Sequence, residues 1–505
     1  MLKSFYITTT IPYVNSDPHI GFALELVQSD AMARYKRLSG FEVFFSTGTD
    51  EHGQKIWEAS QKEGKKIKAY VDYYSGQFQK LKGSLAISND AFVRTTSEHH
   101  IKAAQEMWKR CEASGDIYKK SYTGKYCVGC ESFKMEKDLS PEGRCLLHPN
   151  MEVRVLSEEN YFFRLSKYQK RLLQYLSSSQ VILPDWRRDE AIAFVQGGLE
   201  DFSISREKER LGWGVPVSND SSQVMYVWFD ALVNYISVIG WPTDMKQFGE
   251  WWPAVQICGK DNLRQQSAMW QAMLMSAGIS TSKQIFIHGF ITAEGQKMSK
   301  SLGNVVNPYE LVKIYGTDPV RHFLLGAVPA YEDGDFSIVR FEEWYTAHMA
   351  NGIGNLTSRI LTMIEKYCGG MVPKKSPDCF ETKMFWKQYA ASLTNYHFDE
   401  LIAFVHRYVI LCDEKISAEK PWEKVKKGED VQPLLYQLAE GLRQIAVALL
   451  PIIPHTAETM LKQLGTEERS SAWGKLKKGD KIQKGEPLFP RLINNQQNFT
   501  LNALR

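Results

Sequence analysis

The chain has 505 residues and a formal net charge of +4, and 43% of its residues are hydrophobic and 24% charged. This length predicts three or four domains, and the composition is ordinary for a globular protein. The sequence holds no apolar run near the ~18 residues of a membrane span, which argues against a membrane protein. Because the first residues lead almost directly into a strand, we expect no signal peptide and a cytoplasmic location.

The positive charge is concentrated in the last third of the chain. Residues 351–505 hold 22 Lys and Arg against 17 Asp and Glu, whereas the preceding 350 residues hold 40 against 41. Because a basic surface attracts nucleic acids, this asymmetry favours a polyanionic partner for the C-terminal part. A chance surface composition explains the charge about as well.

The first informative stretch predicts a strand, a loop and the start of a helix. Residues 4–10 (SFYITTT) are rich in β-branched and aromatic side chains, and two prolines then bracket a polar loop. After His19 the apolar residues recur at helical spacing. The helix start should offer free backbone N–H groups to a phosphate, with Gly21 allowing close approach and His19 donating a hydrogen bond. Alone, the pattern fits an ordinary turn with a surface histidine better.

A second stretch carries two lysines three residues apart. Lys297 and Lys300 flank Ser299 in a loop after an expected strand at residues 284–288 (QIFIH). Two ammonium groups on flexible stems suit a polyphosphate whose charge shifts during a reaction. Taken alone, such a pair is usually part of a solvated loop.

The cysteine pattern predicts a metal site. Cys127, Cys130, Cys145 and His148 have the spacing C-x2-C-x14-C-x2-H, which brings two ligand-bearing turns together around a tetrahedral Zn²⁺ ion. Four protein ligands leave no open coordination position, so the predicted role is structural. Disulfides are not expected without a secretion signal. The other five cysteines are interpreted as buried or free thiols.

Asp50 is a candidate for binding an ammonium group. The preceding residues 42–47 (EVFFST) predict a buried strand, so Asp50 lies near the carboxyl end of that strand. Open α/β sheets bind their ligands at this edge. The alternative is an aspartate that caps a turn or a helix.

Together these segments resemble the class I aminoacyl-tRNA synthetases, and within them the methionyl-tRNA synthetase family over essentially the whole chain. Residues 297–301 (KMSKS) match the second signature of the class at all five positions, and residues 19–21 (HIG) match most of the first. Further segments that carry the resemblance are residues 12–13, 48–53 (GTDEHG), 226–231 (YVWFDA), 259–261 (GKD) and 420–422 (KPW), together with the cysteine knuckle.

The resemblance implies an α/β fold. It would have a Rossmann-like catalytic core with a parallel sheet, split by a zinc-bearing insertion and followed by an all-α anticodon-binding bundle. The corresponding boundaries are residues 1–115 and 218–290 for the two halves of the core, 116–217 for the insertion, 291–350 for the signature loop and stem-contact fold, and 351–505 for the helical domain.

The same resemblance implies ATP-dependent attachment of methionine to tRNA through an adenylate, with Mg²⁺ accompanying ATP. His19, Lys297 and Lys300 would be the catalytic residues. The nucleotide site would comprise Tyr13, His19, Gly21, Phe22, Gly259, Asp261 and Lys300, and the methionine site Ile11, Tyr13, Asp50, Trp228, Ala231, Leu232, Tyr235 and Gln266. Aromatic walls suit the apolar, polarizable thioether. By themselves, Trp228 and Tyr235 would more often be core residues.

The helical third would read the tRNA anticodon. Asn355 and Arg359 are four residues apart, on one face of an expected helix, and match the anticodon-reading pair of the family. Trp422 matches its base-stacking tryptophan, although without the resemblance a helix-packing anchor is the better interpretation. Because the chain ends soon after this bundle, we expect a monomer.

Two residues depart from the family pattern. Phe22 stands where the first signature usually has a second histidine, and it cannot donate to a phosphate. Gln266 stands where a histidine usually lies near the methionine side chain, although its amide can still donate a hydrogen bond. The alternatives that stay open are a class I synthetase for another amino acid, a non-catalytic tRNA-binding paralogue and a small-molecule nucleotidyltransferase.

Overall fold

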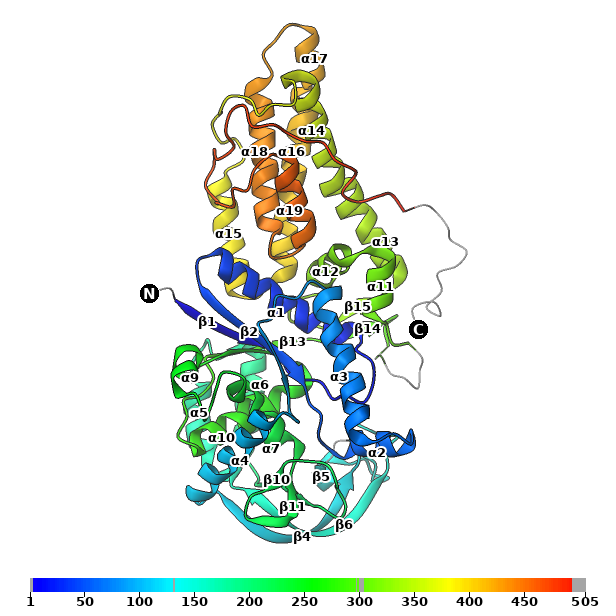
Figure 1. Cartoon of the computed structure of the whole chain (residues 1–505), viewed down its shortest axis with the longest axis vertical. Coiled ribbons are helices and arrows are strands. Elements are labelled where there is room, and N and C mark those ends of the chain that lie inside the picture. The colour runs from blue at the N-terminus through cyan, green and yellow to red at the C-terminus, as the bar shows by residue number, and fades with distance from the viewer. Residues whose placement is uncertain (1–2, 130–131, 297, 299–303, 493–505) are drawn as a thin grey trace. The chain divides into compact units, whose positions relative to one another are not determined.

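The computed structural model describes residues 3–129, 132–296, 298 and 304–492 (Figure 1). Its contacts divide the chain into two compact units. Unit 1 comprises Met1–Pro18, Glu42–Lys82 and Asn89–Ile287, and unit 2 comprises His19–Phe41, Gly83–Ser88 and His288–Arg505.

A six-stranded sheet in the order β3-β2-β1-β12-β13-β7 lies at the centre of unit 1. Its strands are β1 (Ser4–Thr8), β2 (Glu42–Thr49), β3 (Ala91–Arg94), β7 (Ile182–Leu183), β12 (Val255–Gly259) and β13 (Gln284–His288). β1 pairs in parallel with β2 and β12, β2 with β3, and β13 with β7. The predicted parallel sheet is therefore confirmed, and the expected strands at residues 4–10, 42–47 and 284–288 form with end shifts of two residues at most.

The strand order places a topological switch point at β1. From β1 the chain continues to β2 and β3 on one side, whereas β12 and β13 lie on the other. Crevices at the carboxyl ends of strands on either side of such a point are the usual ligand sites of open α/β sheets. The residues that follow β1, β2 and β12 therefore gather at one edge of this sheet.

Unit 1 also contains two antiparallel sheets. One has the order β5-β4-β6-β8 and the other β10-β11-β9. Their strands are β4 (Ile117–Cys127), β5 (Ser132–Lys134), β6 (Val153–Phe163), β8 (Phe202–Ser203), β9 (Ser205–Glu207), β10 (Pro216–Val217) and β11 (Asp220–Met225). The long β4–β6 ribbon carries the cysteine motif at one end, since Cys127 pairs with Val153 there.

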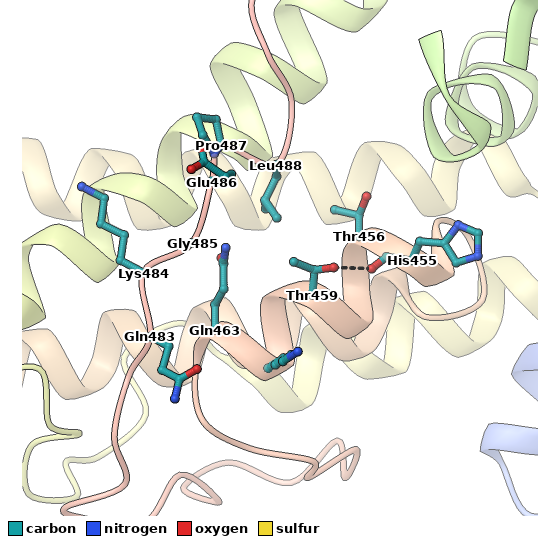
Figure 2. A pocket seen from close by; sticks show the side chains of 11 residues that line it. His455, Thr456, Thr459, Gln463, Gln483, Lys484, Gly485, Glu486, Pro487 and Leu488 are labelled. Carbon is teal, nitrogen blue, oxygen red and sulfur yellow. Dashed lines mark hydrogen bonds between the residues drawn. The ribbon is translucent and has the colours of Figure 1, made fainter. Parts of the chain in front are cut away.

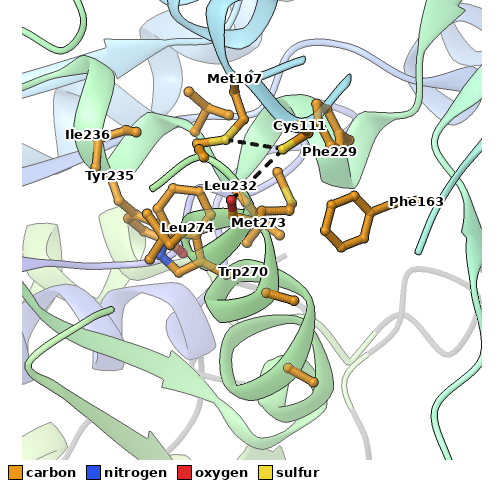
Figure 3. Packing of buried hydrophobic residues seen from close by; sticks show 14 of the residues in the cluster. Met107, Cys111, Phe163, Phe229, Leu232, Tyr235, Ile236, Trp270, Met273 and Leu274 are labelled. Carbon is orange, nitrogen blue, oxygen red and sulfur yellow. Dashed lines mark hydrogen bonds between the residues drawn. The ribbon is translucent and has the colours of Figure 1, made fainter. Parts of the chain in front are cut away.

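Helices surround these sheets. They are α2 (Gln54–Lys62), α3 (Ile67–Ser84), α4 (Glu98–Ala113), α5 (Gln169–Leu176), α6 (Asp185–Gln196), α7 (Val227–Ala231), α8 (Asn234–Ser237), α9 (Met245–Trp251) and α10 (Trp270–Ser276), with a π-helical turn at Gln265–Met269. Of these, α4, α5, α6, α7, α8 and α10 contribute buried apolar residues to one core cluster. Figure 3 shows part of the core, where Met107 and Cys111 of α4 pack with Tyr235 and Trp270.

Unit 2 is mainly helical, as expected for the C-terminal third. It contains α1 (Ile20–Leu38), α11 (Pro308–Tyr315), α12 (Thr317–Gly326), α13 (Ile338–Trp344), a π-helix (Tyr345–Gly354), α14 (Asn355–Cys368), α15 (Thr382–Thr394), α16 (Phe398–Glu419), α17 (Pro421–Lys426), α18 (Gln432–Leu449) and α19 (Pro454–Gln463). α14, α16, α18 and α19 form a bundle (Figure 1). The strands β14 (Ile291–Ala293) and β15 (Gly334–Phe336) pair in parallel. Within the described residues, no helix has the length and apolar character to cross a bilayer.

Three histidines lie inside the helical unit. His322 of α12 is fully buried and its Nδ1 atom accepts a hydrogen bond from Trp344 at 2.8 Å. Its ring lies 5.0 Å from that of His406, which in turn lies 4.3 Å from His348. Burial, together with the smaller effect of the neighbouring His348, lowers the pKa of His406 to about 3. The cluster therefore packs in its neutral form.

We predict that His406 makes the helical unit sensitive to acid. In the unfolded chain this imidazole takes up a proton near pH 6.5, whereas in the folded chain it does so only near pH 3, so stability falls as the pH drops below 6.5. The loss is on the order of 2 kcal/mol at pH 5. His406→Phe should lose correspondingly less unfolding free energy between pH 7.5 and pH 5 in denaturant titrations. His455→Gln, at an exposed histidine, should keep the wild-type dependence. Identical pH dependence in His406→Phe and wild type would contradict the prediction.

Candidate functional site

The first candidate residues lie where β1 and β2 end, at the switch point of unit 1. The loop after β1 runs beside the end of β2, because Asp50 N–H donates to Pro12 O at 2.9 Å and Val14 N–H donates to Asp50 O at 3.2 Å. Tyr13 is therefore held next to Asp50. The Asp50 carboxylate is buried and accepts a hydrogen bond from the backbone N–H of His52 at 3.3 Å. This edge of the sheet thus places a buried carboxylate beside an aromatic ring.

Aromatic side chains from three segments continue the site. The Tyr13 ring packs edge-on against Trp228 of α7, with ring centroids 6.5 Å apart. Tyr235 of α8 is buried, and its hydroxyl oxygen accepts a hydrogen bond from Gln266 Nε2 at 2.6 Å. Gln266 Oε1 accepts in turn from Gln256 of β12 at 3.3 Å. The polar ends of Tyr235 and Gln266 are therefore paired with each other.

The remaining predicted residues of this part lie on the same elements. Ala231 and Leu232, at the end of α7, are buried, and Leu232 belongs to the cluster in Figure 3. Ile11 is half-buried in the loop after β1. Gly259 ends β12, and Asp261 is exposed in the following 3₁₀ turn. The structure thus brings Tyr13, Asp50 and Trp228 together and places Gly259 and Asp261 after the neighbouring strand.

The structure also shows buried charges beside Asp50 that the sequence reading missed. Glu51 is fully buried, and Arg94 donates to both of its carboxylate oxygens, at 2.5 and 3.0 Å. His52 Nδ1 lies 2.6 Å from Asp230 Oδ2, and Asp230 Oδ1 also accepts from His100 Nε2 at 2.9 Å. Both residues that follow Asp50 are therefore fixed by ionic hydrogen bonds. The only signal in the sequence was the run of three ionisable residues at 50–52, and this run does not indicate which residues pair with Glu51 and His52.

The start of α1 forms a separate candidate site in unit 2. His19 is the N-cap of α1, and its Nδ1 accepts a hydrogen bond from Gly21 N–H at 3.1 Å. In the neutral ring the proton must then reside on Nε2, which makes Nε2–H a hydrogen-bond donor. His19 is exposed at the surface, but the protein atoms packed around its ring lower its pKa.

Two expectations about this helix start are corrected. The first backbone N–H groups of α1 are not free: Ile20 N–H donates to Val306 O at 3.0 Å, Gly21 N–H to His19 Nδ1, and Phe22 N–H to His19 O at 3.1 Å. The space beside Gly21 is filled by the imidazole, since a Cβ atom there would lie 2.9 Å from the His19 ring. Phe22 is buried. The role of His19 as a donor to a phosphate stays a prediction, as do the assignments of Gly21 and Phe22 to the nucleotide site.

Residues on both sides of the second sequence stretch contact the start of α1. Ile291 of β14, before the stretch, lies 3.6 Å from the position that a Cβ atom on Gly21 would take. Val306, after it, accepts the hydrogen bond from Ile20. His288 Nε2, at the end of β13, lies 3.0 Å from Glu25 of α1. Lys297 and Lys300 themselves lie outside the described residues, so their side chains are not placed.

The three described residues of the cysteine motif converge, in agreement with its spacing. The side chains of Cys127, Cys145 and His148 place one ligand atom each within 4.8 Å of one another, and the two thiols are buried. Cys130 lies outside the described residues. A Cβ atom on Gly129 would lie only 2.6 Å from the His148 ring, so a glycine is needed for the imidazole to approach. Among the described residues this is the only cluster of three such groups with ligand atoms this close.

The predicted nucleic-acid contacts lie on the helical bundle. Asn355 begins α14 and is exposed, and Arg359 one turn later forms an ion pair with Asp413 of α16. Trp422 follows a tight corner in which Lys420, with φ +41°, both ends α16 and begins α17. Trp422 is 38% exposed, so its ring is not enclosed by neighbouring helices.

A surface hollow of about 450 Å³ lies elsewhere in unit 2, between α19 and residues 483–488 (Figure 2). Its lining mixes basic, acidic and neutral side chains such as Lys462, Lys484 and Glu486. None of the predicted site residues lines it.

Comparisons with known proteins identify the family. The family described as "tRNA synthetases class I (M)" matches residues 5–149 and 139–361, and the "Anticodon-binding domain of tRNA ligase" matches residues 381–493. A methionine–tRNA ligase of Thermotoga maritima is 41% identical over 97% of this chain and 80% of its own length, and one of Rhizobium meliloti is 41% identical over 97% and 98%. The solved structure of Mycobacterium tuberculosis methionyl-tRNA synthetase in complex with methionyl-adenylate superposes with a TM-score of 0.91, at 36% identity, and covers 97% of this chain and 100% of that chain.

The chain belongs to the methionyl-tRNA synthetase family. Membership of this family confirms the class I fold with its helical anticodon-binding part. It also explains why residues from distant segments meet at the carboxyl ends of β1, β2 and β12. The two departures from the family pattern, Phe22 and Gln266, are both buried side chains with protein partners in this structure.

Proposed function

We propose that the described residues support the activity of the family, the ATP-dependent attachment of methionine to its tRNA. In the first step the methionine carboxylate attacks the α-phosphorus of ATP, the bond to the β-phosphate breaks, and pyrophosphate leaves. In the second step a ribose hydroxyl of the tRNA attacks the methionyl carbonyl and AMP leaves. Neither step needs a covalent protein nucleophile, so catalysis rests on positioning and on stabilising the phosphate charge.

One observation carries this proposal: residues before and after the Lys297–Ser301 stretch both contact the start of α1. Ile291 packs beside Gly21, and Val306 accepts from Ile20 N–H. In the sequence, Lys297 and Lys300 lie between these two contacts with the helix start that bears His19. Lys297 and Lys300 are therefore assigned to the ATP phosphates, where their charges stabilise the leaving pyrophosphate.

His19 is assigned as a neutral hydrogen-bond donor to a phosphate oxygen. Its Nδ1 atom is occupied by Gly21 N–H, and the lowered pKa keeps the ring uncharged at pH 7, so Nε2–H is the group available for donation. Gly259 and Asp261, after β12, are assigned to the nucleoside part of ATP. Mg²⁺ is assigned to the ATP phosphates, whose oxygens are its preferred ligands.

The methionine site is assigned to the edge of the sheet in unit 1. The buried carboxylate of Asp50 provides the negative charge that an α-ammonium group needs. Tyr13, Trp228, Leu232 and Tyr235 provide aromatic and apolar surface, with Ile11 and Ala231 beside them, and such surface suits an unbranched thioether. Gln266 acts by holding the hydroxyl of Tyr235.

The helical bundle is assigned to the anticodon. Trp422 is 38% exposed, which leaves ring surface for a base to stack on, and Asn355 and Arg359 lie on one face of α14 with polar groups for base edges. Arg359 would have to exchange its ion pair with Asp413 for such a contact. The protein is proposed to act as a cytoplasmic monomer, with its domain boundaries near residues 115, 217, 290 and 350.

The cluster on the β4–β6 ribbon is assigned to one structural Zn²⁺ ion. Two buried thiols and an imidazole with ligand atoms within 4.8 Å form a soft donor set that suits this metal, and Cys130 would complete it. When bound, the ion supplies a cross-link and no reaction step. Its contribution is to fix the turns that join β4, β5 and the segment before β6.

The proposed function is tested by ATP–pyrophosphate exchange with each of the twenty amino acids, followed by charging of tRNA. We expect exchange with methionine alone, followed by methionine-specific charging of tRNA. Exchange with another amino acid would show that the synthetase is specific for that amino acid instead of methionine. The absence of exchange in folded, zinc-loaded protein that still binds tRNA would favour a non-catalytic paralogue.

Replacement of His19 separates its capping role from its phosphate role. His19→Asn should retain the N-cap, because a short amide oxygen accepts from the second or third N–H of a helix, but it removes the Nε2–H donor. We expect a melting temperature near that of wild type and a fall of 10- to 100-fold in kcat for exchange. His19→Ala should lose kcat similarly and also lose about 1 kcal/mol of stability. Wild-type exchange by His19→Asn would contradict the phosphate role.

Replacement of Gly129 tests the metal site through sterics alone. In Gly129→Ala the added methyl would meet His148 at 2.6 Å, so the imidazole must shift and Zn²⁺ affinity should fall about 10- to 100-fold, as for other displaced ligand shells. Competition with a chromophoric chelator measures this change. Gly76→Ala is the matched control, because its Cβ atom meets nothing within 4 Å. Equal affinity in both variants, or a purified wild type without zinc, would exclude the proposed site.

A further inference from the structure

A buried chain of hydrogen bonds joins four segments around the proposed methionine site. Asp230 of α7 is fully buried, and its two carboxylate oxygens accept from His52 Nδ1 at 2.6 Å and from His100 Nε2 at 2.9 Å. His100 Nδ1 shares a hydrogen bond of 2.9 Å with the hydroxyl of Ser237. The loop after β2, α7, α4 and α8 are thereby linked through one carboxylate.

Each end of this chain adjoins a residue that the proposed function assigns to methionine. The backbone N–H of His52 donates to Asp50 Oδ1 at 3.3 Å, so a shift of His52 moves the proposed ammonium-binding carboxylate. Asp230 is two residues from Trp228 on the same short helix, and Ser237 is two residues from Tyr235. The chain therefore fixes the relative positions of the charged and the aromatic parts of the site.

The Asp230 carboxylate determines which atoms of this hydrogen-bond chain carry protons. Burial alone would raise the pKa of Asp230, but the two imidazoles and their hydrogen bonds lower it to about 2. An ionised carboxylate only accepts, so both histidines must present N–H groups to it. Replacement by an amide of the same shape would place a donor N–H opposite one of these N–H groups.

We infer that Asp230 is a positioning residue for methionine recognition, acting through His52 on Asp50 and through α7 on Trp228. This inference rests on the proposed function, because Asp50 and Trp228 are its assumed methionine contacts. No contact with the reacting atoms is assigned to Asp230. The specific consequence is that its removal should weaken methionine binding far more than ATP binding, since its partners His52 and His100 are not among the residues that the proposed function assigns to ATP.

The matched control is Asp116, a second buried carboxylate of unit 1. It is fully buried and accepts from Lys167 Nζ at 2.5 Å, from Ser276 Oγ at 2.8 Å and from the hydroxyl of Tyr168. None of these partners adjoins a residue assigned to methionine. Asp116→Asn therefore reports the cost of disturbing a buried carboxylate without touching the proposed site.

The experiment compares Asp230→Asn and Asp116→Asn with wild type in methionine-dependent exchange and in equilibrium binding of methionine. For Asp230→Asn we expect KM and Kd for methionine to rise at least 10-fold while KM for ATP changes less than twofold. For Asp116→Asn we expect a lower melting temperature and methionine constants within twofold of wild type. A methionine Kd for Asp230→Asn within twofold of wild type, or equal rises of both KM values in the two variants, would overturn the inference.

Ser237→Ala is the milder second variant, in case Asp230→Asn does not fold. It removes only the hydroxyl that orients His100, and should raise the methionine Kd two- to fivefold with an unchanged melting temperature. An unchanged Kd would contradict the inference. Methionine binding by wild type without exchange would reject the proposed function but leave the positioning role testable by Kd, whereas absent methionine binding by wild type would reject both.

Discussion

The ion pair between Arg321 of α12 and Asp30 of α1 joins several segments of unit 2 through a fully buried guanidinium. Both side chains are fully buried, with 2.8 Å between Arg321 Nη1 and Asp30 Oδ2. Arg321 also donates to the carbonyl oxygens of Leu85, Pro451 and Ile452 at 2.7–3.0 Å. Since the loss of one partner of a buried pair costs about 3–5 kcal/mol, the helix that starts at His19 is strongly tied to the helical bundle. The orientation of α1, and with it that of His19, therefore depends on residues far along the chain.

Charged side chains also pair with each other in unit 1, beside Asp50. Glu51 and His52, which follow Asp50, are each held by a charged partner, the partly exposed Arg94 and the buried Asp230. Buried ion pairs add little net stability compared with apolar residues. They nevertheless require a defined geometry, because each buried donor or acceptor left unpaired lowers the free energy of unfolding. The short loop between β2 and α2 has no large apolar side chain that could fix its conformation. Pairing its polar residues with partners from the surrounding helices gives it a defined conformation instead.

The sequence predicted the elements well because their signals are local. β-branched residues gave β1, helical periodicity gave α1, and the close spacing of Cys145 and His148 was enough to predict that they converge. The partners of buried charges could not be predicted in this way. His52 and Asp230 are 178 residues apart, and a single sequence contains no signal that pairs them.

The error at the start of α1 has a similar cause. The general rule that a helix start offers unpaired N–H groups was correct about the helix but ignored what tertiary structure adds. Val306, almost 290 residues away, takes the first N–H group, and the His19 ring takes the second. The binding of a phosphate at this position would thus depend on the side chain of His19 and not on backbone N–H groups.

The two departures from the family pattern can be understood from what each side chain contacts. Phe22 of α1 is buried, so its side chain contributes to packing. The hydrogen-bond donor at this helix start is therefore the side chain of His19. Gln266 donates to Tyr235 and accepts from Gln256, so both ends of its amide are used within the protein. A thioether sulfur is a weak hydrogen-bond acceptor, so a methionine site loses little when the side chain at this position points its donor elsewhere. In such a site, selection of methionine depends mainly on the shape and polarizability of the aromatic walls, and those walls depend in turn on Tyr235 being held in place.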